Sequence, residues 1–133
     1  MEEDRRSEAR ERALDLLYEA DAKGVSAAVV LAALPVPPDA LAVLLVEGVE
    51  ANRQQIDALI AEHARGWTLE RMPVIDRTVL EVAVFELMKR PDVPTAVVID
   101  EAVELAKRFS TDDSGRFVNG MLATIALLVR PST

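Results

Sequence analysis

The sequence predicts an all-α fold of about seven helices, arranged as two small helical bundles that share one core. Half of the 133 residues are hydrophobic but only 4% are aromatic, so Leu, Val, Ile and Ala must build most of the core. Apolar residues recur at spacings of three and four, the period of one helix face, and no segment alternates as a half-buried strand does. This length suits one domain, 1–133, with sub-bundles of approximately 1–66 and 67–133.

The first quarter of the chain predicts one long and one short helix. The spacing of apolar residues indicates a helix from Arg5 to Ala22, and Gly24 is expected to end it. Ser26 can cap a short second helix that runs to Leu34. Three prolines within 35–38 then break the chain.

A third, long helix is expected from Asp39 to the neighbourhood of Gly66. Gly48 lies on its apolar side, where the missing side chain would let another helix come close. Trp67 is expected to bridge the two bundles, and the turn at Gly66 is the better boundary between them. A short turn over Thr68–Met72 follows.

The second half predicts three further helices. Pro73 can open a helix over Val74–Lys89, which is apolar on nearly all sides and is therefore expected to be central. Thr95 begins the next helix, whose inward residues are expected to be Val98, Ala102, Leu105, Ala106 and Phe109. The last helix begins at Asp113 or Ser114 and stops at Pro131.

Composition excludes several classes of chemistry. Without cysteine there is no disulfide framework, thiolate nucleophile or Cys-type metal site. No glycine-rich phosphate loop, Ser/His/Asp set or HExxH motif occurs, and His63 is the single histidine. No apolar run approaches the roughly 20 residues that cross a bilayer, and no signal-peptide pattern follows the charged N-terminus. We therefore expect a cytoplasmic protein that is not an enzyme, with no cofactor, metal or membrane contact.

The net charge of −8 opposes nucleic-acid binding by bulk electrostatics, because phosphate contacts normally depend on clustered Lys and Arg. Any RNA site must therefore be local, and a partner would be expected to supply additional positive charge.

Three segments carry a resemblance to a known family. The run from Asp92 to Leu122, DVPTAVVIDEAVELAKRFSTDDSGRFVNGML, resembles the signature region of the NusB family. The run from Ala9, ARERALDLLYEAD, resembles the family's first helix, and VIDRTVLEVAVFELMKRPDVP from Val74 resembles its fifth. The three keep the family's order and spacing, and with weaker similarity between them the resemblance covers essentially the whole chain.

The resemblance implies a transcription antitermination factor rather than an enzyme. Such a factor is an RNA-binding adaptor that pairs with NusE, a small-subunit ribosomal protein. Together they recognise boxA-type single-stranded RNA within the RNA polymerase antitermination complex and support ribosomal RNA synthesis. Two alternatives stay open: a NusB-like domain detached from an RNA cytosine methyltransferase, and a homodimer whose RNA face is occluded.

The start of the last helix is one candidate RNA site. A cap at Asp113 or Ser114 would place an acceptor beside the cation of Arg116 and the ring of Phe117. The residues alone favour a plain helix cap and a core Phe117; the resemblance implies instead RNA contacts by Asp113, Arg116 and Phe117. Gly120 follows inside the helix, where glycine costs about 1 kcal/mol relative to alanine, and so predicts a close helix contact.

The first helix is the second candidate RNA site. Arg6 and Arg10 lie four residues apart on one face, with Tyr18 continuing the stripe and Arg5 adjacent. The acidic neighbours of these arginines favour a solvated helix face when the residues are taken alone. The resemblance implies RNA binding by Arg5, Arg6, Arg10 and Tyr18, although residues 7–8 here are Ser and Glu where the family is commonly basic.

The predicted central helix carries a candidate protein-partner surface. Asp76, Arg77 and Glu81 form a charged patch that continues into apolar residues including Phe85. Charges around an apolar surface suit a protein partner, and they suit packing against a neighbouring helix just as well. The resemblance implies that this region contacts NusE through Asp76, Arg77, Glu81 and Phe85.

Overall fold

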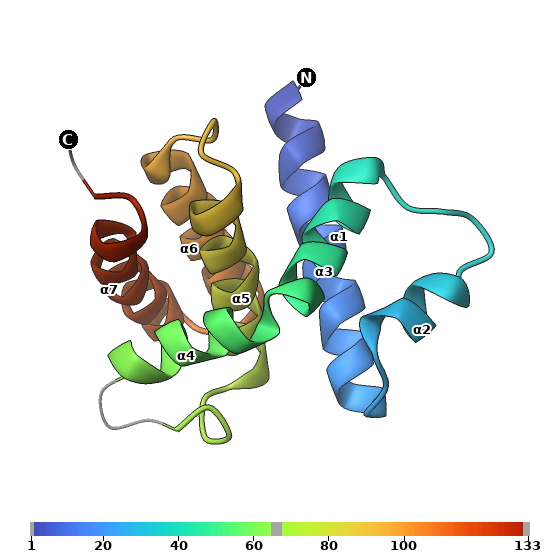
Figure 1. Ribbon diagram of the computed structural model, residues 1–133, viewed down its shortest axis with the longest axis horizontal. Helices are drawn as coiled ribbons and strands as arrows, with labels where there is room; N and C mark the ends of the chain where they lie inside the picture. Colours follow the sequence, from blue (N-terminus) through green and yellow to red (C-terminus); the bar gives the residue numbers. More distant parts are fainter. Residues whose placement is uncertain (1, 65–67, 132–133) are drawn as a thin grey trace.

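The computed structural model describes residues 2–64 and 68–131, and the all-α prediction is confirmed there. These residues form seven helices and no strand (Figure 1). The helices are α1 (Glu2–Lys23), α2 (Ala27–Ala32), α3 (Ala40–Ala51), α4 (Arg53–His63), α5 (Val74–Lys89), α6 (Thr95–Phe109) and α7 (Asp112–Val129). None of the helices in the described ranges is long and apolar enough to span a bilayer.

Helix α5 is central, as predicted. It packs against α1, α3, α4, α6 and α7, and Figure 1 shows it between the α6–α7 pair and the crossing of α1 with α3. Eleven of its 16 residues are buried. A helix that is apolar on nearly all sides can bury its apolar surface only when other helices surround it. One continuous core therefore links the two halves of the chain.

Local signals set the ends of the first helices. Gly24 follows α1 with φ of 66°, a left-handed conformation that glycine adopts without steric cost. The Ser26 hydroxyl accepts from the Val29 amide at 3.3 Å and caps α2, as predicted. The Asp39 carboxylate accepts from the Leu41 amide at 2.8 Å and caps α3.

The single long helix predicted from Asp39 to near Gly66 is wrong, because the helix breaks at Asn52. There the backbone leaves helical geometry (φ −113°, ψ 21°), and the side-chain amide donates to the Gly48 carbonyl at 2.8 Å. Asparagine competes in this way with the helix's own hydrogen bonds. The break sends α4 away from α3 and across α5 and α7 (Figure 1). Buried Ile56 continues the apolar pattern beyond the break. The spacing of apolar residues therefore gave no sign that the helix ends at Asn52.

The prediction for Gly48 is confirmed. A Cβ atom at this position would lie 2.2 Å from Cζ of Phe85 and 2.3 Å from its Cε1. The Phe85 ring therefore sits directly on the backbone of α3, and glycine is required for α3 and α5 to approach this closely.

The predicted boundary at Gly66 and the bridging role of Trp67 lie outside the described residues. The division into sub-bundles 1–66 and 67–133 stays a prediction. Helix α4 belongs to the first of these segments in sequence but packs against α5 and α7 of the second.

Arg130, just after α7, donates hydrogen bonds to the end of α5 and the start of α6. Its guanidinium donates to five oxygens: the carbonyls of Glu86 (3.2 Å), Leu87 (3.0 Å), Arg90 (2.8 Å) and Val93 (2.6 Å) and the hydroxyl of Thr95 (3.0 Å). These acceptors lie at the end of α5 and in the turn that leads into α6, where helix carbonyls lack partners. One side chain thus ties α7 to the α5–α6 corner.

Candidate nucleic-acid interface

The start of α7 is set by a capping box at Thr111, two residues before the earlier of the two caps predicted. The Thr111 hydroxyl accepts from the Ser114 amide at 3.0 Å, and the Ser114 hydroxyl accepts from the Thr111 amide at 3.4 Å. The prediction that Asp113 or Ser114 is the cap is therefore wrong. Because Thr111 already supplies the capping oxygen, the Asp113 carboxylate extends into solvent.

A buried hydrogen bond fixes this helix start to α5. The Ser114 hydroxyl donates to one Asp76 oxygen at 2.9 Å, and the other Asp76 oxygen has no hydrogen-bond partner among the described residues. Asp76 is only 4% exposed. Its carboxylate is enclosed between the first turns of α5 and α7 and is therefore not at the surface, where the predicted partner contact would place it.

The surface at the start of α7 combines an acceptor, a cation and an aromatic ring, as predicted. Asp113 and Arg116 form an exposed ion pair, which contributes little stability because water screens it. Phe117 is half-buried and lines two cavities. One, of about 290 Å³, includes Asp76 and Thr111; the other, of about 470 Å³, lies toward α4. Both exposed charges are free to exchange partners with a ligand.

Arg10 does not lie on the surface. Its guanidinium donates to both oxygens of Glu86, at 2.7 and 3.0 Å, and lies 3.6 Å from Glu101. Arg10 is 2% exposed and Glu86 is 1% exposed. Arg10 is therefore not at the surface, where the predicted phosphate contact would place it. Arg10 and its carboxylate partners can be buried between α1, α5 and α6 because their charges neutralise each other.

Arg5 and Arg6 are exposed near the start of α1. Each lies near Glu2, at 3.9 and 3.7 Å, in loose surface pairs. Arg6 lines a cavity of about 510 Å³ beside the first turns of α6, with Val97 and Glu104. Helix α6 runs from there to Phe109 before α7 begins, and residues 97 to 109 span about 18 Å at 1.5 Å per residue. The two candidate groups are therefore separate surfaces.

Tyr18 lies nearer the start of α7 than these arginines do. Ser7, Glu11 and Tyr18 fall on one stripe of α1. Ser7 donates to Glu101 at 2.5 Å, and Arg108 pairs with Glu11 at 3.0 Å, so this stripe follows α6 from its start toward its end. Tyr18 lies seven residues beyond Glu11 on the same stripe and is 44% exposed.

Phe109 and Arg108 are exposed features that the sequence analysis did not single out as functional. Phe109 was expected to face inward because it continues the spacing of Leu105, but it is 40% exposed at the end of α6. The Arg108 guanidinium lies 4.8 Å from the centre of its ring, within cation–π distance. The spacing of apolar residues alone could not show that the core ends one turn before α6 does.

The predicted partner surface on α5 is also mostly internal. Phe85 is 5% exposed beneath Gly48, and Glu81 is 3% exposed. Arg77 is partly exposed, and its side chain pairs with Asp21 at 2.6 Å. Neighbouring helices cover Glu81 and Phe85, which are therefore not at the surface, where the predicted partner contacts would place them.

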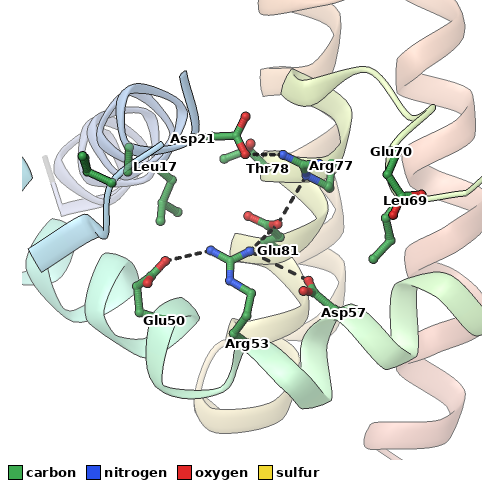
Figure 2. Close-up of a pocket in the computed structure, with 12 residues that line it drawn as sticks. Leu17, Asp21, Glu50, Arg53, Asp57, Leu69, Glu70, Arg77, Thr78 and Glu81 are labelled. Atoms are coloured by element: carbon green, nitrogen blue, oxygen red, sulfur yellow. Dashed lines mark hydrogen bonds and ion pairs between the residues drawn. The ribbon is translucent and has the colours of Figure 1, made fainter. Parts of the chain in front are cut away.

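Glu81 belongs to an ionic network in a cleft of about 330 Å³ (Figure 2). Arg53 lies 2.5 Å from Glu81, 2.8 Å from Glu50 and 3.8 Å from Asp57, and Arg77 lies 3.6 Å from Glu81. Burial raises the pKa of Glu81 to about 7, and the two arginines oppose this shift. Sequence reasoning missed Arg53, which reaches this site because the helix breaks just before it.

The comparisons with known proteins identify the family. The model of the NusB family matches residues 7–127. The chain belongs to the NusB family. It is 57% identical over 127 residues to the transcription antitermination protein NusB of Saccharopolyspora erythraea, a match that covers 91% of this chain and 86% of the relative. It is 50% identical over 128 residues to that of Salinispora tropica, covering 91% and 94%.

Solved NusB structures have the same fold. T. maritima NusB matches with a TM-score of 0.85 and 33% identity, covering 95% of this chain and 93% of that one. A chain from a structure described as antitermination factors NusB and NusE in complex with dsRNA matches with a TM-score of 0.78 and 25% identity, covering 93% and 96%.

The NusB match covers one candidate RNA surface fully and the other in part. Asp113, Arg116, Phe117 and Tyr18 lie within the matched residues, whereas Arg5 and Arg6 precede them. Arg5 and Arg6 therefore lie just before the segment that this chain shares with the family model.

Proposed function

We propose that this protein is a transcription antitermination factor that acts as an RNA-binding adaptor. It pairs with NusE and holds boxA-type single-stranded RNA within the antitermination complex of RNA polymerase, in support of ribosomal RNA synthesis. The observation that carries the proposal is the 57% identity to an antitermination NusB over nearly the whole chain. In this role the protein acts in the cytoplasm, by assembly rather than by catalysis.

The start of α7 is proposed as the principal RNA contact. The Phe117 ring can stack on an unpaired base, Asp113 can accept from base amino groups, and Arg116 can donate to a base or a phosphate. Tyr18 offers a second ring from α1. These polar groups read base edges, so replacing them is expected to change sequence preference.

Arg5 and Arg6 are proposed as phosphate contacts on the same RNA strand. Because α6 separates them from α7, the strand must pass along the side of α6 to touch both surfaces. Phosphate contacts carry no sequence information. Loss of these arginines is therefore expected to weaken binding to every RNA sequence and to flatten the dependence on salt.

The charge of this chain supports a requirement for NusE. At a net charge of −8 the protein gains little from counterion release on its own. A partner that brings positive charge would raise RNA affinity, and the related complex combines NusB, NusE and RNA. Arg77, at the cleft of Figure 2, is the member of the predicted partner set that remains accessible for such a contact.

Two alternative functions have less support. A detached domain of an RNA cytosine methyltransferase is disfavoured because the similar proteins are antitermination proteins by name. A homodimer with an occluded RNA face remains compatible with the fold. Light scattering coupled to gel filtration distinguishes it from a monomer.

The test of the proposal is a mobility-shift titration of boxA RNA with this protein, with and without its own NusE. We expect weak binding alone and markedly tighter binding with NusE. A scrambled RNA of equal length serves as the control. Equal affinity for both RNAs, or tight binding that NusE does not improve, would contradict the proposal.

A further inference from the structure

Gly120 lies in the middle of α7, where it faces open space. We expected it to mark a close contact between helices, but a Cβ added there would meet no atom within 4 Å among the described residues. Gly120 is exposed, and its backbone φ is not positive, unlike that of Gly24. Neither packing within the described chain nor backbone conformation accounts for a glycine at this position.

Glycine in a helix interior destabilises the helix relative to alanine. At Gly48 a buried ring explains the choice, since any side chain would clash with it. At Gly120 the described chain offers no such explanation. A bare stretch of helix on the surface is useful when something outside the chain must approach its backbone closely.

The space beside Gly120 is a groove between α4 and α7. It has a volume of about 470 Å³, and its lining includes His63 on α4 and Phe117, Met121 and Thr124 on α7. The Thr124 hydroxyl donates to the Gly120 carbonyl at 3.2 Å, so the polar group on the floor is satisfied. The Gly120 carbonyl therefore has a hydrogen-bond partner within α7.

Cationic and polar groups flank this floor. Arg116 lines the groove one turn before Gly120, with its guanidinium in solvent. On the α4 side, Nδ1 of His63 lies 2.7 Å from the Leu59 carbonyl, which can only accept, so Nδ1 carries the proton. Nε2 is then the ring nitrogen left to accept a hydrogen bond from a ligand. Glu62 is the one acidic residue in the lining.

We propose that single-stranded RNA continues from Phe117 into this groove, with its sugar–phosphate backbone lying against α7 at Gly120. Arg116 binds a phosphate, and Nε2 of His63 accepts from a ribose 2′-hydroxyl. The inference rests on the proposed RNA-binding function and specifies where the strand runs. It makes α4 a part of the RNA site, a role that the sequence analysis did not assign.

The groove's chemistry favours RNA over a protein segment. Phe117 lines both the groove and the neighbouring cavity at the start of α7, so a base stacked there would lead the strand directly into the groove. The groups in the groove match the parts of a nucleotide: the cation of Arg116 suits a phosphate, the ring of Phe117 suits a base, and Nε2 of His63 suits a ribose hydroxyl. Phe117 to Thr124 span about 10 Å along the helix, so the groove extends beyond the reach of one base.

The test compares two variants at positions on the same helix. Gly120→Gln places a long neutral side chain over the groove floor, and Ala123→Gln places the same side chain on an exposed position outside the groove lining. We expect Gly120→Gln to weaken boxA affinity of the NusE complex by about tenfold or more, and Ala123→Gln to leave it within about twofold. Gly120→Gln should melt at or above the wild-type temperature, because glutamine favours a helix over glycine, and Ala123→Gln should melt only slightly below it, because glutamine is a slightly weaker helix former than alanine.

A second measurement separates RNA from protein as the occupant. Titration of NusE without RNA should give the same affinity for wild type and Gly120→Gln. His63→Ala should lower affinity for RNA while leaving affinity for the corresponding DNA unchanged, since DNA lacks the 2′-hydroxyl.

Three results would overturn the inference. If Gly120→Gln binds boxA as wild type does, the strand does not enter the groove, although the proposed function stands. If the variant weakens NusE binding in the absence of RNA, the groove is a protein site. If the wild-type complex does not bind boxA at all, the proposed function fails as well.

Discussion

The contact between Gly48 and Phe85 allows a quantitative test of the packing. In Gly48→Ala the new methyl carbon would lie 2.2 to 2.8 Å from three ring carbons of Phe85, whereas carbon atoms in contact normally sit about 3.5 to 4.0 Å apart. The ring must therefore shift by more than about 1 Å in a core where Phe85 is only 5% exposed. Overpacking of this kind costs about 1 to 3 kcal/mol, and we expect the upper end.

The helix propensity of alanine offsets about 1 kcal/mol, so the expected net loss is about 2 kcal/mol. Urea unfolding followed by circular dichroism measures it. A matched control is Gly120→Ala, where open space predicts a gain of about 1 kcal/mol instead. In a Phe85→Leu background the penalty of Gly48→Ala should shrink, because a smaller side chain leaves room for the methyl group. A Gly48→Ala protein as stable as wild type would refute the reasoning.

Three further changes test the ionic and capping interactions. Arg10→Met should destabilise the fold by about 3 kcal/mol in urea unfolding, because it leaves Glu86 buried with only Arg90 as its partner; an unchanged midpoint would contradict this. Burial raises the pKa of Glu81 from 4.5 to about 7. Between these pH values the folded state holds a proton that the unfolded state has released, so the free energy of unfolding should fall by about 3 kcal/mol as the pH rises from 4.5 to about 7. Glu81→Gln should flatten that pH profile, and an unaltered profile would rule the shift out. Thr111→Ala should cost about 1 kcal/mol of thermal stability and Thr111→Ser much less, since serine retains the capping oxygen.

The sequence predicted those elements whose cause is local. The apolar surface of α5 and the glycine that ends α1 depend on residues near one another in the chain. The break at Asn52 escaped prediction because one side-chain hydrogen bond decides it while the apolar period continues on both sides. The cap of α7 was misplaced because Thr111, Asp113 and Ser114 all offer suitable oxygens, and only the geometry shows which one is used.

The candidate sites divide in the same way. Asp113, Arg116 and Phe117 share one short helical segment, so their spacing sufficed to place them together. The burial of Arg10 depends on Glu86, 76 residues away, and that of Glu81 on Arg53, 28 residues away. Spacing within a helix cannot reveal such partners, so charged residues on α1 and α5 were assigned to the surface when they belong to the interior.

The position of α5 has a consequence for synthesis on the ribosome. Helices α1 and α3 emerge before α5, but α6 and α7, which cover its remaining surface, are translated afterwards. Arg130, which joins the ends of α5 and α6, emerges later still. A nascent chain that has just exposed α5 therefore presents the apolar surface of its central helix to solvent or to chaperones. Native structure must therefore await translation of α7.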